Sequence, residues 1–261
     1  MRLGKKIQAL SRRPAASERL SARAVRHRTA ATSRIIHVVA GVLIDGAGRV
    51  LIAQRPAGKH LAGGWEFPGG KLEPGESRSA GLARELREEL GIVIGQPRPL
   101  LRLCHTYPYG EVLLDVWVVR RYRGEPHGLD GQQLRWCRRD ELAKTELLPA
   151  DRPILAALRL PERLRRMCTR YYRIGDMGPV RSRRSRGLPN PLGLLGVFCR
   201  NAAEAAGAAA AGADFLVMRE ALPDSELAAS CDAAAVPLFA SGITLARAWA
   251  LGASGINAIA G

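Results

Sequence analysis

The sequence predicts an α+β domain built as an α/β/α sandwich, followed by a partial parallel βα segment. Two observations lead to this prediction. Residues 35–158 contain β-rich apolar runs around one amphipathic helix, and residues 194–261 alternate short apolar runs with Ala-rich helices. Residues 159–193 are rich in Arg, Pro and Gly and form a predicted linker. Residues 1–34 are strongly basic and are predicted to be a disordered tail.

The first domain is expected to begin with two strands, Ile35–Ile44 and Arg49–Gln54, which the turn cluster Asp45–Gly48 joins into a hairpin. A loop then spans Arg55–Gly64, and a short apolar run leads into a tight turn at Gly69-Gly70. The main helix and further elements follow. The later strands are expected at Leu100–His105, Val112–Arg120 and Gln133–Cys137, and the later helices begin at Asp140 and Asp151.

The C-terminal segment shows the regular alternation that is typical of parallel βα units. About four units are visible, whereas a closed (βα)8 barrel needs eight, so the segment is expected to be half of a barrel. One more strand is expected in the linker, at Tyr171–Ile174. The segment's strands are expected at Leu194–Phe198, Phe215–Met218, Pro237–Ala240 and Ile256–Ala260, and its helices at Asn201–Gly212, Ser225–Cys231 and Thr244–Leu251.

The composition and the charge of the chain limit the classes of function that it can have. With 47% hydrophobic residues the chain can bury a core, and no apolar run approaches the ~18–20 residues of a membrane span. The net charge of +16 is concentrated in residues 1–34 and 159–186. Because aromatic residues do not alternate with these charges, a dedicated nucleic-acid groove is not predicted. Nonspecific contact of the basic arms with RNA is expected.

The cysteines are far apart along the chain and lack any metal-binding spacing. They are therefore expected to be buried thiols in a reducing compartment, which predicts a cytoplasmic protein. The sequence makes no prediction of the oligomeric state. The cysteines are Cys104, Cys137, Cys168, Cys199 and Cys231.

The stretch Gly70–Ile92 carries the strongest chemical signal. Residues three and four apart share a face of a helix, so Glu85, Glu88 and Glu89 should project together while the leucines of the stretch point the other way. Three unpaired carboxylates on one face repel one another, and a divalent cation between them removes the repulsion. Mg²⁺ prefers oxygen ligands and completes its shell with water and substrate phosphates.

The spacing of this stretch resembles the Nudix box, G-x5-E-x7-R-E-U-x-E-E-x-G-U with U aliphatic. Its fixed positions are held by Gly70, Glu76, Arg84-Glu85, Glu88-Glu89 and Gly91-Ile92. The flanking sequence resembles MutT-type 8-oxo-dGTP diphosphatases, and the likeness covers about half of the chain. The residues that carry it are Gln54-Arg55-Pro56, His60, Glu66–Lys71, Gly124-Glu125-Pro126, Asp130–Gln132 and Leu148–Asp151.

This resemblance implies hydrolysis of oxidised purine nucleoside triphosphates, such as 8-oxo-dGTP, to the monophosphate and pyrophosphate. It implies Mg²⁺ as the cofactor, with Mn²⁺ as a substitute, and a role in sanitation of the nucleotide pool. The implied ligands are Glu85 and Glu89, with Glu88 in support, the carbonyl of Gly69, and Asp130 from a separate loop. Related enzymes usually have Glu at the position of Asp130. The general base stays open among Glu88, Glu89 and Asp130.

The other site residues are expected to act on the substrate or on the ligands. Arg84 should pair with Glu76 and orient Glu85. Lys71 and Arg55 are candidates for phosphate contacts, with a solvated surface cation as the alternative for each. Two further residues, His60 near the mouth and Phe67 in the base pocket, are candidates for contact with the nucleotide.

Asp151 stands where MutT-type enzymes usually have Asn. An amide donates to the purine O6 and accepts from the N7–H of the oxidised base, whereas a carboxylate accepts only. An unpaired polar contact in a buried pocket costs roughly 1–3 kcal/mol, so Asp151 places base specificity in question unless the carboxyl is protonated or displaced. Alternatively, Asp151 caps the helix that begins near Pro153.

The C-terminal segment resembles the last half of a thiamine-phosphate-synthase or TenI barrel at Gly212–Phe215, Ala240–Thr244 and Gly252–Ile256. The earlier strands of such a barrel have no visible counterpart, so this segment is expected to lack catalysis of its own. The resemblance leaves a second enzyme hypothesis, in which the Nudix domain cleaves thiamine-pathway or other pyrophosphates. A third hypothesis is a non-catalytic RNA-binding protein with basic arms.

Overall fold

The computed structural model describes residues 35–108, 110–164, 171–173 and 194–257. The predicted tail and most of the predicted linker lie outside the described residues, as do Cys168 and the end of the last expected strand. None of the helices in the described part of the chain is long and apolar enough to cross a membrane.

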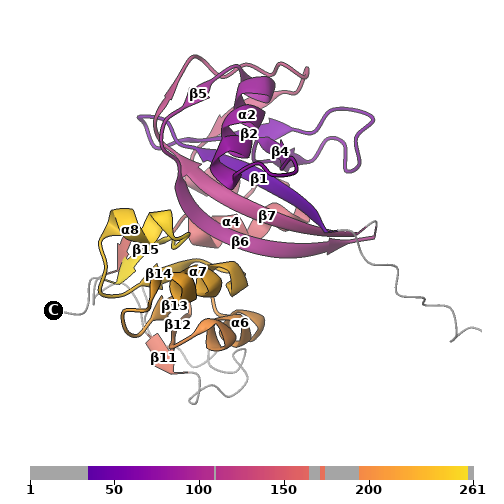
Figure 1. The fold of residues 1–261 in the computed structure, drawn as a ribbon. Coiled ribbons are helices and arrows are strands. Elements are labelled where there is room, and N and C mark those ends of the chain that lie inside the picture. Colours follow the sequence, from indigo (N-terminus) through magenta and orange to yellow (C-terminus); the bar gives the residue numbers. More distant parts are fainter. Residues whose placement is uncertain (1–34, 109, 165–170, 174–193, 258–261) are drawn as a thin grey trace, which may run out of the picture. The chain divides into compact units, whose positions relative to one another are not determined.

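A mixed sheet forms the centre of the first domain (Figure 1). Within the described residues it has the order β4-β1-β7-β6, with β1 parallel to β7 and the other pairs antiparallel. Strand β1 lies between β4 and β7. The Gly69–Lys71 stretch is therefore a short strand that pairs with β1, and the tight turn expected at Gly69-Gly70 is wrong. The strands are β1 (Ile36–Leu43), β4 (Gly69–Lys71), β6 (Arg98–Tyr107) and β7 (Gly110–Val119).

Helix α2 (Arg78–Leu90) begins and ends at clear local signals. The hydroxyl of Ser77 accepts the N–H of Ala80 at the N-terminus, and Gly91 adopts a left-handed conformation with φ of 70° at the C-terminus. The inward-facing leucines Leu82, Leu86 and Leu90 are fully buried. Each such side chain contributes about 1.5–3 kcal/mol of burial free energy, so this face anchors the helix and leaves its acidic face free for chemistry.

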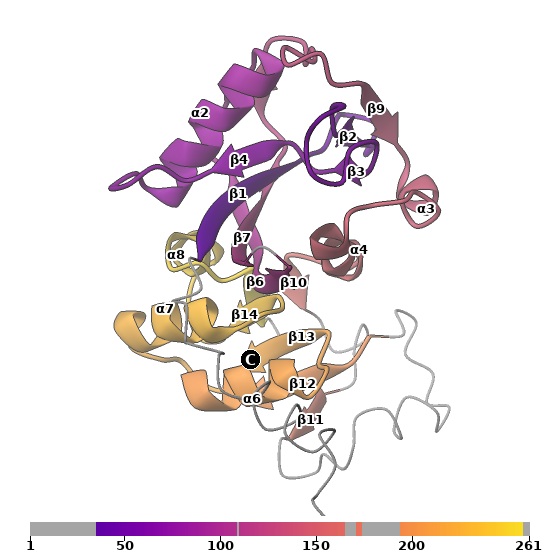
Figure 2. The ribbon, with the colours of Figure 1, turned by 90° about the vertical axis from the view of Figure 1, so that its right-hand side faces the viewer.

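Alternating residues of β1 pack against opposite helices. Val39 and Leu43 join the cluster that contains the α2 leucines, whereas Ala40 and Val42 join the cluster that contains Ile154 of α4 (Arg152–Ala157). The two helices therefore cover opposite faces of the mixed sheet (Figure 2). This arrangement confirms the α/β/α sandwich.

A second, antiparallel sheet has the order β3-β2-β9 in the described residues. The hairpin expected between β1 and β2 is wrong, because the two strands lie in different sheets and share only the bridge between Ile44 and Val50. Strand β1 pairs instead with β4 and β7, which come later in the chain. The elements of this part are β2 (Val50–Gln54), β3 (Trp65–Glu66), β5 (Val93–Ile94), β8 (Tyr122–Arg123), β9 (Leu134–Cys137), α3 (Arg139–Leu142) and the 3₁₀ turn η1 (Pro149–Asp151).

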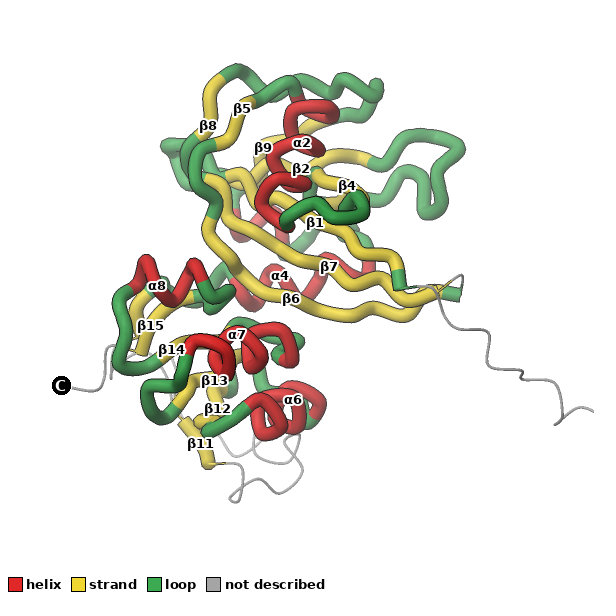
Figure 3. The backbone as a smooth tube through the Cα atoms, viewed as in Figure 1, coloured by secondary structure: helices red, strands yellow, loops and turns green. Residues whose placement is uncertain are grey.

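The C-terminal segment forms a parallel sheet with helices on one face (Figure 3). In the described residues its order is β10-β15-β14-β13-β12-β11, and every pair is parallel, which is consistent with the predicted parallel βα segment. The two-residue strand β10 was too short to predict. The elements are β10 (Arg163–Leu164), β11 (Tyr171–Arg173), β12 (Gly196–Cys199), α6 (Ala202–Ala210), β13 (Phe215–Met218), α7 (Asp224–Ala233), β14 (Leu238–Ala240), α8 (Leu245–Ala250) and β15 (Gly255–Asn257).

Of the described cysteines, Cys137, Cys199 and Cys231 are buried free thiols, as expected. Cys104 is exposed, so the prediction of a buried thiol is wrong there. Cys104 lies on β6 at a position whose side chain faces away from the core, because alternate residues of a strand face opposite sides.

Candidate active site

A cavity of about 670 Å³ opens in the first domain. Its volume lies in the range of small-molecule sites. The wall is formed by β1, β3, β4, α2 and the loops around Lys59 and Asp130. Of the residues predicted from sequence, those that line this cavity are Arg55, His60, Phe67, Gly69, Lys71, Glu85, Glu88, Glu89, Asp130 and Asp151.

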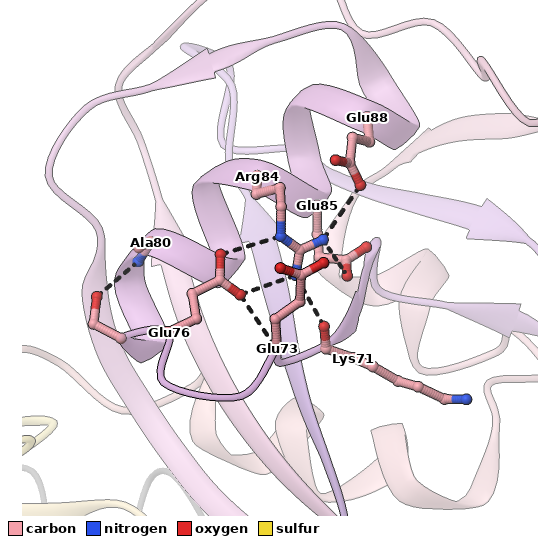
Figure 4. Close-up of polar contacts among 8 residues, drawn as sticks. Lys71, Glu73, Glu76, Ala80, Arg84, Glu85 and Glu88 are labelled. Atoms are coloured by element: carbon pink, nitrogen blue, oxygen red, sulfur yellow. Dashed lines mark hydrogen bonds and ion pairs between the residues drawn. The ribbon is translucent and has the colours of Figure 1, made fainter.

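Arg84 stands outside the cavity wall and holds the acidic face of α2 together (Figure 4). Its Nε and Nη2 donate to the two carboxylate oxygens of Glu76 at 3.1 and 3.0 Å, which confirms the predicted pair. Its Nη1 donates to Glu85 at 2.9 Å and to Glu88 at 3.3 Å. Nη2 also donates to the carbonyl of Lys71 at 3.0 Å. The guanidinium therefore ties the loop, strand β4 and the helix to one point.

The charges around Arg84 shift the pKa values of the partners. The hydrogen bond from Arg84 lowers the pKa of Glu76, and the hydrogen bonds to Glu76 and Glu85 raise the pKa of Arg84. The expectation that the helix carboxylates are unpaired is wrong for Glu85 and Glu88, because both accept from Arg84. A single basic residue of the pattern thus neutralises part of the acidic face.

Glu89 has a different environment. One carboxylate oxygen accepts the N–H of Gly69 at 3.0 Å. Burial raises the pKa of Glu89 to about 7, and the charges of Glu66, Glu85 and Asp130 add to the increase. The carboxylate therefore lies in a field of negative charge that a cation would offset.

Two glycines let strand β4 lie close to its neighbours. A Cβ at Gly70 would stand 2.2 Å from Oε2 of Glu85, and a Cβ at Gly69 would stand 2.1 Å from the carbonyl oxygen of Val39. Gly69 also has a φ of 149°, which side chains rarely adopt. Gly70 is thus required because the Glu85 carboxylate occupies the space of a side chain, and Gly69 is required because of the Val39 carbonyl and its own backbone conformation.

The donor set fits a hard divalent cation such as Mg²⁺. Glu85 and Glu89 bring carboxylates to the cavity, and Gly69 brings backbone from β4. The described residues contain no group of three or more His, Cys, Asp or Glu side chains arranged to hold a metal by themselves. Mg²⁺ does not need such a group, because it keeps several waters and takes substrate phosphate oxygens.

Two of the predicted metal ligands, Glu88 and Asp130, have other partners in the structure. Glu88 has a side chain that is 61% exposed and accepts from Arg84. Asp130 lies 3.5 Å from Nζ of Lys59, and both side chains are about half exposed. The structure therefore brings Glu85 and Glu89 together with Gly69, and leaves Glu88 and Asp130 at the rim of the site.

The opposite side of the cavity contains an ion pair that sequence reasoning missed. Nη1 of Arg55 donates to Glu66 at 2.5 Å, and both side chains are largely buried. Nε of Arg55 is buried without a hydrogen-bond partner. Lys59 and Tyr107 also line the cavity, and the ring of His60 meets Tyr107 edge-on with centroids 6.3 Å apart. No local pattern paired Glu66 with Arg55, because Glu66 lies on β3 and Arg55 lies in the loop after β2.

Asp151 lies at the end of η1 and is 5% exposed. The alternative that it caps helix α4 is wrong, because its side chain makes no capping hydrogen bond. Its carboxyl faces the backbone N–H of Phe67 instead. Burial raises the pKa of Asp151 well above its usual value, and the charge of Glu66 raises it further. This part of the cavity therefore holds a carboxyl group that favours its neutral form.

The known proteins that resemble this chain match the half that contains the first domain. Residues 39–157 match the NUDIX domain family. A CTP pyrophosphohydrolase of Escherichia coli is 41% identical, with 48% of this chain and 91% of the relative covered. An 8-oxo-dGTP diphosphatase of Escherichia coli is 33% identical, with 48% of this chain and 96% of the relative covered. The solution structure of the E. coli ORF135 protein is 38% identical, covers 49% of this chain and 91% of that chain, and has a TM-score of 0.45.

Proposed function

The chain belongs to the NUDIX domain family and is a Nudix pyrophosphohydrolase, and we propose that its substrates are oxidised purine nucleoside triphosphates such as 8-oxo-dGTP. The observation that carries the proposal is the placement of Glu85 and Glu89 beside Gly69 in a cavity of nucleotide size. In the proposed reaction, water attacks phosphorus and a P–O–P bond breaks. The products are the nucleoside monophosphate and pyrophosphate.

Some residues of the site supply charge or metal ligands, and others hold those residues in position. A bound divalent cation would offset charge on the phosphate oxygens and lower the pKa of a water ligand. Glu85 and Glu89 supply oxygen ligands, and the N–H of Gly69 fixes the Glu89 carboxylate. Arg84 holds Glu85 in place. Lys59 and Lys71 line the cavity as cations that attract the triphosphate.

Glu89 is the general base that we propose. Its carboxylate lines the cavity and is held by the N–H of Gly69 at 3.0 Å, so it is positioned to accept a proton from water inside the cavity. Glu88 is exposed and held by Arg84, and Asp130 faces Lys59, so both are placed less well for the proton of an attacking water.

A second candidate substrate is a cytidine triphosphate. A relative at 41% identity is named CTP pyrophosphohydrolase. A thiamine-pathway pyrophosphate remains a prediction from the C-terminal resemblance. The parallel sheet agrees with that resemblance only at the level of strand direction. We also propose a cytoplasmic location, in keeping with a nucleotide substrate and the free thiols of the described residues.

A substrate panel tests the proposal. Release of pyrophosphate from 8-oxo-dGTP, dGTP and CTP, and release of orthophosphate from thiamine diphosphate, are measured with Mg²⁺ and with Mn²⁺, and each kcat/KM is compared. The highest kcat/KM is expected for 8-oxo-dGTP or CTP, and Glu89→Gln should lower kcat by roughly 1,000-fold. Glu125→Gln, an exposed carboxylate outside the cavity, is the matched control. A thiamine diphosphate that exceeds every triphosphate, or full turnover by Glu89→Gln, would overturn the proposal.

A further inference from the structure

The first domain contains another groove, which lies beyond the end of β1. Its volume is about 740 Å³, within the range of small-molecule sites. We call it the arginine groove, and it is lined by residues 44–46, 93–95 and 120–123. Strands β5 and β8 form one wall as an antiparallel pair (Figure 3). None of these residues lines the cavity of the candidate active site, so the two sites are separate.

Three of the four consecutive residues 120–123 are arginines. Arg120, Arg121 and Arg123 are all exposed. In the described part of the chain none of them forms an ion pair with an acid, whereas the neighbouring Arg49 does. Burial lowers the pKa of Arg98, and the charge of Arg120 lowers it further. Like charges without an acidic partner repel one another, and a bound anion would remove the repulsion.

The acid that lines this groove, Asp45, is already occupied by other donors. Its Oδ1 accepts the backbone N–H groups of Ala47 at 3.0 Å and of Arg49 at 2.8 Å. Its Oδ2 accepts Nε of Arg49 at 2.7 Å. The carboxylate therefore serves the turn after β1 and does not compensate the three arginines across the groove.

The arginines are carried by backbone that is anchored to the core. Ile94 and Tyr122 are paired across β5 and β8, and both pack against the cluster that contains the α2 leucines. The next pair along, Val93 and Arg123, faces the other side, because alternate residues of a strand face opposite sides. Val93 is 52% exposed there. Part of the positive wall is thus held in place before a ligand arrives, which lowers the entropic cost of binding.

We propose that the arginine groove binds a short phosphate-anhydride chain, either as free pyrophosphate or as the diphosphate group of a nucleotide. Planar guanidinium groups match pairs of phosphate oxygens. The Cα atoms of Arg120 and Arg123 are at most about 11 Å apart, so the positive charge is concentrated over the length of a compact anion. The inference goes beyond the proposed function, because it concerns a second site and holds for any substrate of the first.

Isothermal titration calorimetry on the whole chain tests this assignment. EDTA is present, so that no divalent cation joins the titrant to the carboxylates of the active site or supports hydrolysis. The titrants are pyrophosphate, ADP, orthophosphate and adenosine. Pyrophosphate and ADP should bind at least about 10-fold more tightly than orthophosphate, because they offer more oxygens to the guanidinium groups, and adenosine should not bind. The tighter of the first two identifies the source of the chain.

Substitutions in the groove locate the binding. Arg120→Gln, Arg121→Gln and Arg123→Gln combined should raise the Kd for pyrophosphate by about 10- to 100-fold. Lysine at the same three positions keeps the charge but loses the planar fork, so Kd should rise by about 3- to 10-fold. Asp45→Asn keeps an oxygen acceptor for the turn and removes a negative charge from the wall, so Kd should fall by about 2- to 5-fold.

A matched control removes the same charge elsewhere on the first domain. Arg87→Gln, Arg138→Gln and Lys144→Gln combined change three exposed residues outside the groove and should leave Kd within about 2-fold, because salt screens distant charges. Lys59→Ala removes a cation of the active-site cavity and should likewise leave Kd within about 2-fold. Circular dichroism should show all of these variants folded.

The outcomes are decisive for the groove and independent of turnover. An unchanged Kd in the triple glutamine variant, or an equal rise in the matched control, overturns the assignment. A Kd that rises in Lys59→Ala but not in the groove variant would place the anion in the active-site cavity instead. A single-stranded DNA oligonucleotide that binds through the three arginines, while pyrophosphate and ADP do not bind, would overturn the choice of ligand. The proposed function fails separately, if no triphosphate is hydrolysed with Mg²⁺ or Mn²⁺.

Discussion

Arg84 binds Glu76 through two parallel hydrogen bonds, from Nε at 3.1 Å and from Nη2 at 3.0 Å. The same guanidinium donates to Glu85 at 2.9 Å from its third nitrogen. All three nitrogens are in use, so the planar fork of arginine sets the position of the loop and of a predicted metal ligand together. This relationship explains why the pattern needs arginine at this position, beyond its positive charge.

Arg84→Lys should therefore lower activity although the charge is kept. A lysine makes one point contact in place of the fork, so Glu85 loses its fixed position. We expect kcat to fall by about 10- to 100-fold, equal to about 1.4–2.7 kcal/mol of transition-state stabilisation, with a smaller change in KM. Steady-state kinetics on the preferred triphosphate measure this effect.

Arg87→Lys is the matched control for this substitution. Arg87 lies on the same helix and is exposed, so its replacement should change kcat by less than about 2-fold. Circular dichroism should show both variants folded. Equal kcat values for the two variants would contradict the positioning role of Arg84.

Gly70→Ala should disable the site while the fold survives. The added Cβ would stand 2.2 Å from the Glu85 carboxylate, and this neighbour is the end of a side chain that can move aside. The main effect is thus a displaced metal ligand, and we expect kcat to fall by about 100-fold. Gly46→Ala adds a methyl group to open space and should leave kcat unchanged. Wild-type activity in Gly70→Ala would show that Glu85 need not stay where the structure places it.

Much of this site follows from the sequence alone because its residues lie close together along the chain. Gly70, Glu76, Arg84, Glu85 and Glu89 are separated by helical and loop spacings that place them side by side. The buried leucines of α2 follow from the same periodicity. The spacing along the chain was enough to predict these neighbours, and the structure confirms the Glu76–Arg84 pair.

Long-range contacts explain what the sequence did not reveal. Strand propensity indicated β1 and β2 correctly, but it carries no information on partners, so the expected hairpin is wrong. Asp151 has a local position that suits a helix cap, yet its carboxyl is buried in the cavity and faces the backbone of Phe67 on a distant segment. Glu66 and Arg55 likewise become a pair only through the fold.

Lys59→Ala should affect binding more than stability. Nζ of Lys59 lies 3.5 Å from Asp130, and both side chains are about half exposed. Such surface pairs contribute roughly 0–1 kcal/mol, so the unfolding midpoint should stay within about 2 °C. Because Lys59 lines the cavity, its removal should raise KM for the triphosphate about 3- to 10-fold with little change in kcat. The exposed Lys144 provides a control, Lys144→Ala, that should leave KM unchanged. A KM that does not move would place Lys59 outside the phosphate contacts.

Without metal, the stability of the protein should fall between about pH 5 and pH 8. Burial and neighbouring charges raise the pKa of Glu89 from 4.5 to about 7. Folding therefore favours its protonated form. The resulting stabilisation is fully present below about pH 4.5 and is lost as pH rises through about 7. We expect the unfolding midpoint in EDTA to decrease by roughly 2–4 °C over this range for each kcal/mol lost.

Mg²⁺ should reverse this loss, because a cation at Glu89 stabilises the ionised form. The rise in unfolding midpoint on addition of Mg²⁺ should thus be larger at pH 8 than at pH 5.5. Thermal unfolding with and without Mg²⁺ at both pH values measures the difference. Glu89→Gln has no carboxyl to titrate at this position, so it should reduce the pH dependence and lose most of the Mg²⁺ effect, whereas the exposed Glu125→Gln should keep both in full. An equal Mg²⁺ effect at the two pH values would remove Glu89 from the metal ligands and leave Glu85 to hold the cation with the backbone of Gly69.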